Sequence, residues 1–223
     1  MNATGGQGIN RRKLFWVAVA LLGGVAAFWL FGLKLILKLH KGRGAPCPSS
    51  WSWLVDNPLR RWDVRHALDR VGIRAGETVL ELGPGPGAFT VEAAGRVGQG
   101  GRLIAVDIQP AMIAQVAARV RRAGLTNVET HVASAYDLPL DDGTVDRAFL
   151  ITVLPEIPDP VRGLREVYRA LKPGGIVSIT EEFLDPDYPL RRTTVAWAEA
   201  AGFVCVARHG SWWTYTLNFR KPC

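Results

Sequence analysis

Residues 79–87 read VLELGPGPG, an apolar run that leads directly into three alternating glycines. The apolar run predicts a buried strand, and the glycines predict a tight turn at the start of a helix. Glycine lets the backbone approach a ligand closely, and the amides at a helix N-terminus can donate hydrogen bonds to it. In α/β sheets cofactors bind at such turns, so this stretch predicts both the fold class and the place of a cofactor site.

The sequence on either side of this turn alternates short apolar runs with amphipathic helical patterns, as in a parallel sheet covered by helices. The expected strands are 78–82, 103–107, 128–132, 145–151 and 176–180. The expected helices are 87–97, 110–123, 160–172 and 190–201. Two further β-rich runs, 203–208 and 212–219, predict a terminal antiparallel hairpin. The whole pattern is that of a doubly wound, Rossmann-like α/β sheet of seven strands.

Two carboxylates accompany the glycine turn. Glu81 comes just before it, and Asp107 ends the second expected strand, 24 positions after Gly83, where a carboxylate can accept hydrogen bonds from ribose hydroxyls. By spacing alone Gly83, Gly85 and Ala88 also satisfy the dinucleotide pattern, so an NAD(P)-dependent oxidoreductase is an alternative. Glu81 would be ill placed beside a pyrophosphate, but it suits a ligand that carries an ammonium and a sulfonium.

Four blocks of sequence, in this order, resemble the class I S-adenosylmethionine-dependent methyltransferases. They are VLELGPGPGAFT at 79–90, AVDIQPAMI at 105–113, ASAYDLPLDDGTVDRAFLITVL at 133–154 and LREVYRALKPGGIVSI at 164–179. The resemblance covers residues 58–223 and implies methyl transfer to a small-molecule or lipid-like acceptor, with S-adenosyl-L-methionine as cofactor. A non-catalytic, methyltransferase-like membrane adaptor is a third alternative.

The resemblance also implies where the methionine and ribose moieties of the cofactor bind. Gly83, Gly85 and Gly87 would pass beneath the methionine moiety, with Glu81 near its amino group. Asp107 would accept hydrogen bonds from the ribose hydroxyls.

Later blocks imply the adenine end and the methyl-donor side of the site. Ile108 would flank the adenine. Where the family often has Gly-Asp-Ala, this chain has Ala-Ser-Ala, so Ser134 and Ala135 stand in the adenine-binding positions without the usual acid. Leu150, Ile151 and Thr152 would line the methyl-donor side. Pro155 and Glu156 stand where similar quinone-biosynthesis methyltransferases often have two histidines. This difference weakens the inference that the chain acts on the same substrate.

Methyl transfer from a sulfonium demands neither a nucleophilic side chain nor a metal, because the leaving group is already good and positioning supplies much of the acceleration. A general base helps when the acceptor carries a proton. The candidate catalytic residues are Glu156, Glu181 and Tyr188, together with Glu182, since each is expected at or after the carboxyl end of a strand.

The basic excess of the chain is concentrated near its N-terminus. Of 27 Lys and Arg residues seven lie in residues 1–44, which contain no Asp or Glu, so the remainder carries 20 basic and 20 acidic residues. Such a distribution favours anionic lipid over nucleic acid as a partner. The three cysteines imply neither a disulfide framework nor a zinc site, and no metal site is expected.

Residues 14–33 read LFWVAVALLGGVAAFWLFGL, contain no charged residue, and as a helix could cross a bilayer. This expected transmembrane helix lies between a basic tail at 1–13 and a basic linker at 34–50, with the methyltransferase domain at 51–223. A cleaved signal peptide is the alternative, but the apolar run is longer than such signals usually have. We expect a single-pass protein of the cell membrane whose catalytic domain faces the cytoplasm.

Overall fold

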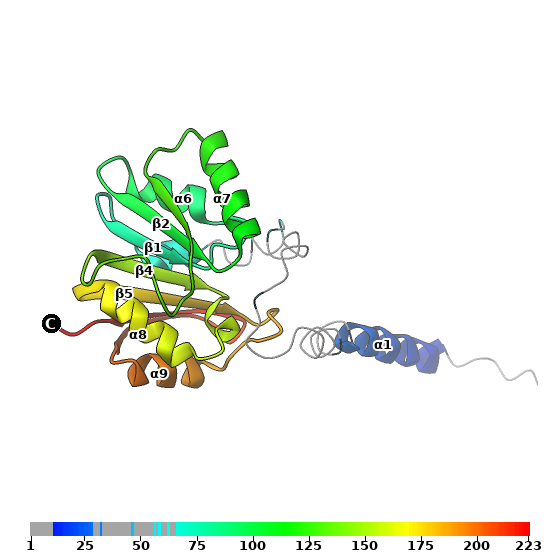
Figure 1. Ribbon diagram of the computed structural model, residues 1–223. Helices are drawn as coiled ribbons and strands as arrows, with labels where there is room; N and C mark the ends of the chain where they lie inside the picture. Colours follow the sequence, from blue (N-terminus) through cyan, green and yellow to red (C-terminus); the bar gives the residue numbers. More distant parts are fainter. Residues whose placement is uncertain are drawn as a thin grey trace, which may run out of the picture. The chain divides into compact units, whose positions relative to one another are not determined.

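The computed structural model describes residues 11–28, 32, 46, 56, 58, 62 and 66–223, and the chain divides into two units, Met1–His40 and Lys41–Cys223. In the first unit α1 (Arg11–Ala27) is a helix of 17 residues with exposed apolar side chains such as Phe15 and Trp16 (Figure 1). Among the residues described, no helix is both long enough and apolar enough to cross a membrane.

Parts of the N-terminal predictions lie outside the described residues. These are residues 1–10 of the expected basic tail, residues 29–31 and 33 of the expected span, and nearly all of the expected linker. Before the first strand the structure describes a short helix, α5 (Ala67–Val71), and most of residues 51–65 lie outside the described residues.

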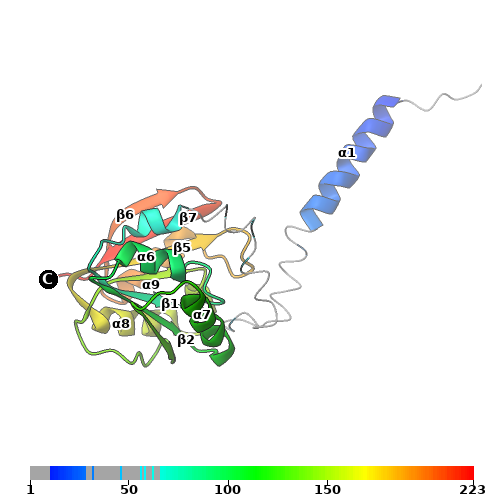
Figure 2. The ribbon, with the colours of Figure 1, turned by 90° about the horizontal axis from the view of Figure 1, so that it is seen from above.

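The second unit is built on one sheet of seven strands in the order β3-β2-β1-β4-β5-β7-β6. The strands are β1 (Thr78–Leu82), β2 (Arg102–Asp107), β3 (Val128–Val132), β4 (Val145–Ile151), β5 (Leu171–Glu182), β6 (Val204–Gly210) and β7 (Thr214–Arg220). The first five strands run parallel, and β7 is antiparallel to both β5 and β6. The predicted seven-stranded sheet with a terminal hairpin is confirmed, and β6 forms one edge of it (Figure 2).

Helices cover both faces of the sheet (Figure 1). One face, here called the α6 face, carries α5, α6 (Thr90–Val97) and α7 (Pro110–Arg122). The opposite face, called the α8 face, carries α8 (Pro160–Ala170) and α9 (Arg191–Ala200). Val79 and Leu103 pack on the α6 face, whereas Leu80 and Leu150 pack in the larger core on the α8 face.

The change of face lies between β1 and β4. β1 leads into α6 and its neighbour β4 leads through a short 3-10 helix, η3 (Leu154–Glu156), into α8 on the opposite face. The two connections therefore separate at the carboxyl ends of these strands. Ligands of open α/β sheets bind at such a topological switch point.

The predicted boundaries hold for β1, β3 and β4, and they fail at β5. The helix predicted over 160–172 ends at Ala170, and β5 begins at Leu171 rather than near residue 176. A residue before proline is disfavoured in the helical conformation, so Pro173 ends the helix before it and Lys172 is already extended. Similarly α6 begins at Thr90 instead of residue 87, because the glycine turn occupies the intervening residues.

Candidate functional site

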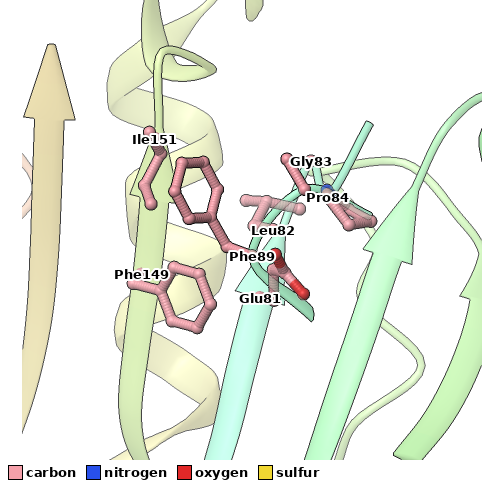
Figure 3. A pocket seen from close by; sticks show the side chains of 8 residues that line it. Glu81, Leu82, Gly83, Pro84, Phe89, Phe149 and Ile151 are labelled. Atoms are coloured by element: carbon pink, nitrogen blue, oxygen red, sulfur yellow. The ribbon is translucent and has the colours of Figure 1, made fainter. Parts of the chain in front are cut away.

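A pocket opens at the carboxyl ends of β1 and β4, at the switch point of the sheet (Figure 3). Its lining comes from the end of β1, the glycine turn, the residues before α6 and the end of β4. The lining residues are Glu81, Leu82, Gly83, Pro84, Ala88, Phe89, Phe149 and Ile151. The stretch that predicted the fold therefore also forms one wall of the pocket.

The glycines of the turn adopt backbone conformations that other residues avoid. Their φ angles are +71° at Gly83, +54° at Gly85 and +84° at Gly87. A Cβ atom at Gly83 would lie 2.5 Å from Cγ2 of Val153, in the segment that follows β4. Glycine is therefore required at residue 83 for close approach as well as for its backbone conformation.

Glu81 is a buried carboxylate on the α6 face, 2% exposed. Its Oε2 atom is buried and has no hydrogen-bond partner within the described part of the chain. Burial raises the pKa of Glu81 to about 8, against the opposing effect of the Thr90 hydroxyl, and the negative charge of Asp107 raises this pKa further. A bound cation would stabilise the ionised carboxylate, so the residue fits the ammonium group of the implied cofactor.

Asp107 turns its carboxylate toward the glycine turn. Its Oδ1 accepts a hydrogen bond from the Gln109 amide at 2.9 Å, and its Oδ2 accepts one from the Gly85 amide at 3.3 Å. Burial raises the pKa of Asp107 in spite of these amides. Each carboxylate oxygen keeps a second lone pair, so ribose hydroxyls can still donate to this group.

Glu81 and Asp107 are two buried carboxyl groups beside the glycine turn. Because burial raises the pKa of Glu81 to about 8, a bound cation would stabilise its ionised form, whereas an anion would not. The residues thus fit a ligand with positive charge and ribose hydroxyls, and they fit a pyrophosphate poorly.

Leu150 does not line the pocket, contrary to our expectation. It is 1% exposed and lies in the core on the α8 face, because successive residues of a strand point to opposite faces. Its neighbours Phe149 and Ile151 face the pocket instead, together with Phe89, as Figure 3 shows. Ile151 was expected on this side of the site, and counting alternate positions along β4 would also have identified Phe149. No comparable pattern marks Phe89.

The region expected to hold the adenine lies at the ends of β2 and β3. Ile108 is 57% exposed, and Val132, which pairs in register with Asp107, is 52% exposed. These apolar groups could cover a flat base. The Ser134 hydroxyl oxygen accepts a hydrogen bond from the Tyr136 amide at 3.2 Å, which leaves its proton for a ligand, whereas Ala135 packs against the core.

Glu181 lies away from the pocket. It is fully buried and pairs in register with Tyr215, a core residue of the α8 face whose hydroxyl bonds Thr194 of α9. Strand alternation directs the next residue, Glu182, to the α6 face, where it is 4% exposed. Of these two neighbours, Glu182 therefore has the side chain on the pocket's face of the sheet.

The other two catalytic candidates have different surroundings. The Tyr188 hydroxyl donates a hydrogen bond to the Trp212 carbonyl, and burial raises its pKa, so it is poorly suited to accept a proton. Glu156 is half-buried in η3, directly after β4. Glu156 thus remains the predicted base that follows a strand of the pocket.

Thr152, at the end of β4, has a strained backbone. Its φ is +55°, a conformation that β-branched residues rarely adopt. The strain persists because its amide donates to the Thr180 carbonyl at 2.8 Å and its hydroxyl donates to the Ile151 carbonyl at 2.8 Å. Nothing in the sequence signalled this conformation, which fixes the backbone beside the pocket.

Comparison with known proteins agrees with this geometry. Residues 80–179 match the family model described as a methyltransferase domain. Over 123 residues the chain is 37% identical to a ubiquinone/menaquinone biosynthesis C-methyltransferase, UbiE, of Enterobacter sp. (strain 638). The match covers 55% of this chain and 49% of that protein, so the chain spans about half the length of this curated relative.

Solved structures share the fold. A SAM dependent methyltransferase from Aquifex aeolicus has a TM-score of 0.74 at 24% identity and covers 79% of this chain and 100% of its own. Geranyl diphosphate C-methyltransferase from Streptomyces coelicolor A3(2), solved with S-adenosyl-L-homocysteine, has a TM-score of 0.62 at 16% identity and covers 73% of this chain and 79% of its own. The chain therefore shares its fold with these solved methyltransferases, and residues 80–179 match a methyltransferase domain.

Proposed function

We propose that this protein is a membrane-associated enzyme that uses S-adenosyl-L-methionine to methylate a small apolar or lipid-like acceptor. The observation that carries the proposal is the pair of buried carboxyl groups, Glu81 and Asp107, on either side of the glycine turn. Glu81 can ionise beside the ammonium of such a cofactor, and Asp107 can accept hydrogen bonds from its ribose.

When bound, S-adenosyl-L-methionine supplies a methyl group that passes to the acceptor as its sulfur–carbon bond breaks, leaving S-adenosyl-L-homocysteine. The chain contributes mainly position and the exclusion of water. Gly83 brings the backbone close, Glu81 attracts the ammonium, and Asp107 orients the ribose. Where the acceptor carries a proton, Glu156 is positioned after β4 to accept it.

Two features support an apolar acceptor. The relative from Enterobacter is named for quinone biosynthesis, and a structural neighbour for a prenyl diphosphate. In the described residues, the walls of the pocket opposite Glu81 are apolar, with Phe89, Phe149 and Ile151.

Membrane association rests on the N-terminal segment. The side chains of α1 that the structure describes are exposed and mostly apolar, including Phe15, Trp16 and Leu22. In a bilayer they would be buried in lipid, with the basic residues beside the phosphate groups. We propose a single span with the catalytic domain in the cytoplasm, where the cofactor is made. Anchoring would raise the effective concentration of a membrane-dissolved acceptor.

A transfer assay tests the proposal. Full-length protein is incubated with S-adenosylmethionine labelled in its methyl group and with quinone precursors, phospholipids or hydrophobic thiols in vesicles. We expect label in the organic phase for one acceptor class, and at least about tenfold less with Asp107→Ala at a cofactor concentration below saturation. Label that stays with S-adenosylmethionine for every class, although the cofactor binds, would contradict the proposed acceptor chemistry.

A further inference from the structure

Four aromatic side chains gather where β5 ends and β7 begins. The Phe183 ring centroid lies 5.3 Å from those of both Trp212 and Trp213 and 5.6 Å from that of Tyr188. We call these four residues the aromatic platform. Trp212 is 66% exposed, and the exposed side chains of Leu184 and Leu190 belong to the same connection between β5 and α9 as Phe183.

The platform is held in place by hydrogen bonds between two distant segments of the chain. The Phe183 amide donates to the Trp213 carbonyl at 2.6 Å, and the Tyr188 hydroxyl donates to the Trp212 carbonyl. Arg191 donates from Nη2 to the Gly210 carbonyl at 2.8 Å. These hydrogen bonds hold the backbone at Trp212, whose side chain is exposed. A preorganised, exposed aromatic surface loses little conformational entropy when a ligand covers it.

The platform lies at the same edge of the sheet as the pocket. Ile151, in the pocket wall, pairs in register with Thr180 of β5, and two residues further along β5 Glu182 pairs with Thr214 of β7. Phe183 and Trp213 come directly after and before that last pair. Since neighbouring strands are about 4.8 Å apart and each residue advances about 3.3 Å along a strand, the platform lies roughly 10–15 Å from the end of β4.

We propose that the aromatic platform binds the apolar body of the methyl acceptor, an elongated, uncharged molecule whose reacting atom lies beside Ile151 and Thr152. The inference rests on the proposed function, because it names the acceptor class of the same site. The aromatic rings, together with Leu184 and Leu190, would make dispersion contacts with the acceptor and bury its apolar surface. The Arg191 guanidinium at the base of the platform disfavours a cationic ligand there.

Chain-length dependence of binding tests this proposal without the natural acceptor. Full-length protein saturated with S-adenosylhomocysteine is titrated calorimetrically with 1-octanol, 1-decanol and 1-dodecanol in one detergent. Each added methylene that reaches the platform is expected to tighten binding about three- to fourfold. Trp212→Ala is expected to weaken 1-dodecanol binding about tenfold and to flatten this dependence.

Val204→Ala is the matched control, since Val204 is a 54% exposed apolar residue on edge strand β6. It should leave the chain-length dependence of the parent unchanged. Affinity could depend on alkanol chain length equally in Trp212→Ala and in the parent, while both bind S-adenosylhomocysteine equally well. That result would overturn the proposed role of the aromatic platform and leave the proposed function standing. Loss of vesicle binding by Trp212→Ala with unchanged alkanol binding would also overturn it, because the platform would then bind a lipid surface. Failure of every sample to bind S-adenosylhomocysteine would instead refute the proposed function.

Discussion

The two halves of the carboxyl edge of the sheet differ in how they are built. The half at β1 and β2 holds glycines with positive φ and two buried carboxylates, all within residues 81–107. The half at β5 and β7 holds aromatic side chains from segments around residues 183–190 and 211–213. The first half is local in sequence and specified by backbone and charge. The second depends on tertiary contacts and on apolar surface, so we expect the first to tolerate substitution far less.

The glycine turn should give the largest effect. Gly83→Ala places a Cβ at a φ of +71° and 2.5 Å from Val153, so we expect about 4 kcal/mol of destabilisation and loss of cofactor binding. Gly72→Ala is the matched control, because its φ is +70° and no atom lies within 4 Å of the added Cβ. It should cost about 1 kcal/mol. Urea unfolding and cofactor titration measure both.

Adding Val153→Ala to Gly83→Ala separates the two causes. If the contact dominates, the double variant recovers part of the lost stability. If the double variant is no more stable than Gly83→Ala, the contact with Val153 is not what requires glycine.

Glu81, in the half at β1 and β2, should make the free energy of unfolding depend on pH. Because its pKa is raised from 4.5 to about 8 in the folded chain, the folded state keeps a proton that the unfolded state loses between these values. The free energy of unfolding should therefore fall as pH rises from about 5 to 8, by up to about 1.4 kcal/mol per pH unit. Unfolding curves of the parent and Glu81→Gln at four pH values measure it. If the free energy of unfolding depended on pH equally in the parent and in Glu81→Gln, the raised pKa of Glu81 would be contradicted.

The same proton should link pH to cofactor affinity. An ammonium beside Glu81 favours the ionised carboxylate, so binding should release a proton below about pH 8 and tighten as pH rises. Calorimetric titrations with the cofactor in buffers of different ionisation enthalpy measure the number of protons released on binding. Equal proton release by Glu81→Gln would mean that another group titrates.

Asp107 tests the ribose contact. Asp107→Ala removes a charged hydrogen-bond acceptor and should weaken S-adenosylhomocysteine binding about 10- to 100-fold. The control is Asp142→Ala, whose side chain is 81% exposed and pairs with Arg169 at the surface. Its affinity should match the parent. An Asp107→Ala variant that folds and binds as tightly as the parent would place the ribose elsewhere.

The smallest effect is expected in the half at β5 and β7. Tyr188→Phe removes the hydrogen bond to the Trp212 carbonyl and should cost less than about 1.5 kcal/mol of stability. Its kcat should stay within about threefold of the parent, because a raised pKa keeps the Tyr188 phenol protonated and so unable to accept a proton. A hundredfold loss of kcat with normal stability would instead make Tyr188 a catalytic residue.

The contrast between the halves also explains what the sequence could predict. β1, β3 and β4 were predicted at their observed ends because each is an apolar or β-rich run bounded by turn residues. The positions of Glu81 and Asp107 followed from the same local pattern. The side assigned to Leu150 was wrong, since a one-residue error on a strand reverses the face.

Tertiary structure decided the rest. Glu181 and Glu182 are adjacent in sequence, yet one lies in the α8-face core and the other points to the pocket's face of the sheet. The strained backbone at Thr152 is held by a hydrogen bond from its amide to the Thr180 carbonyl of β5. The aromatic platform joins segments more than 20 residues apart, as the Tyr188–Trp212 hydrogen bond illustrates, and no local pattern predicts such contacts.

The most direct test of the central claim is a calorimetric titration of the full-length protein with S-adenosylmethionine and, separately, with NADH. The paired carboxylates predict binding of S-adenosylmethionine that Asp107→Ala weakens, and no binding of NADH. Binding of NADH alone by the folded protein would contradict the account, because a pyrophosphate would then occupy the pocket beside Glu81.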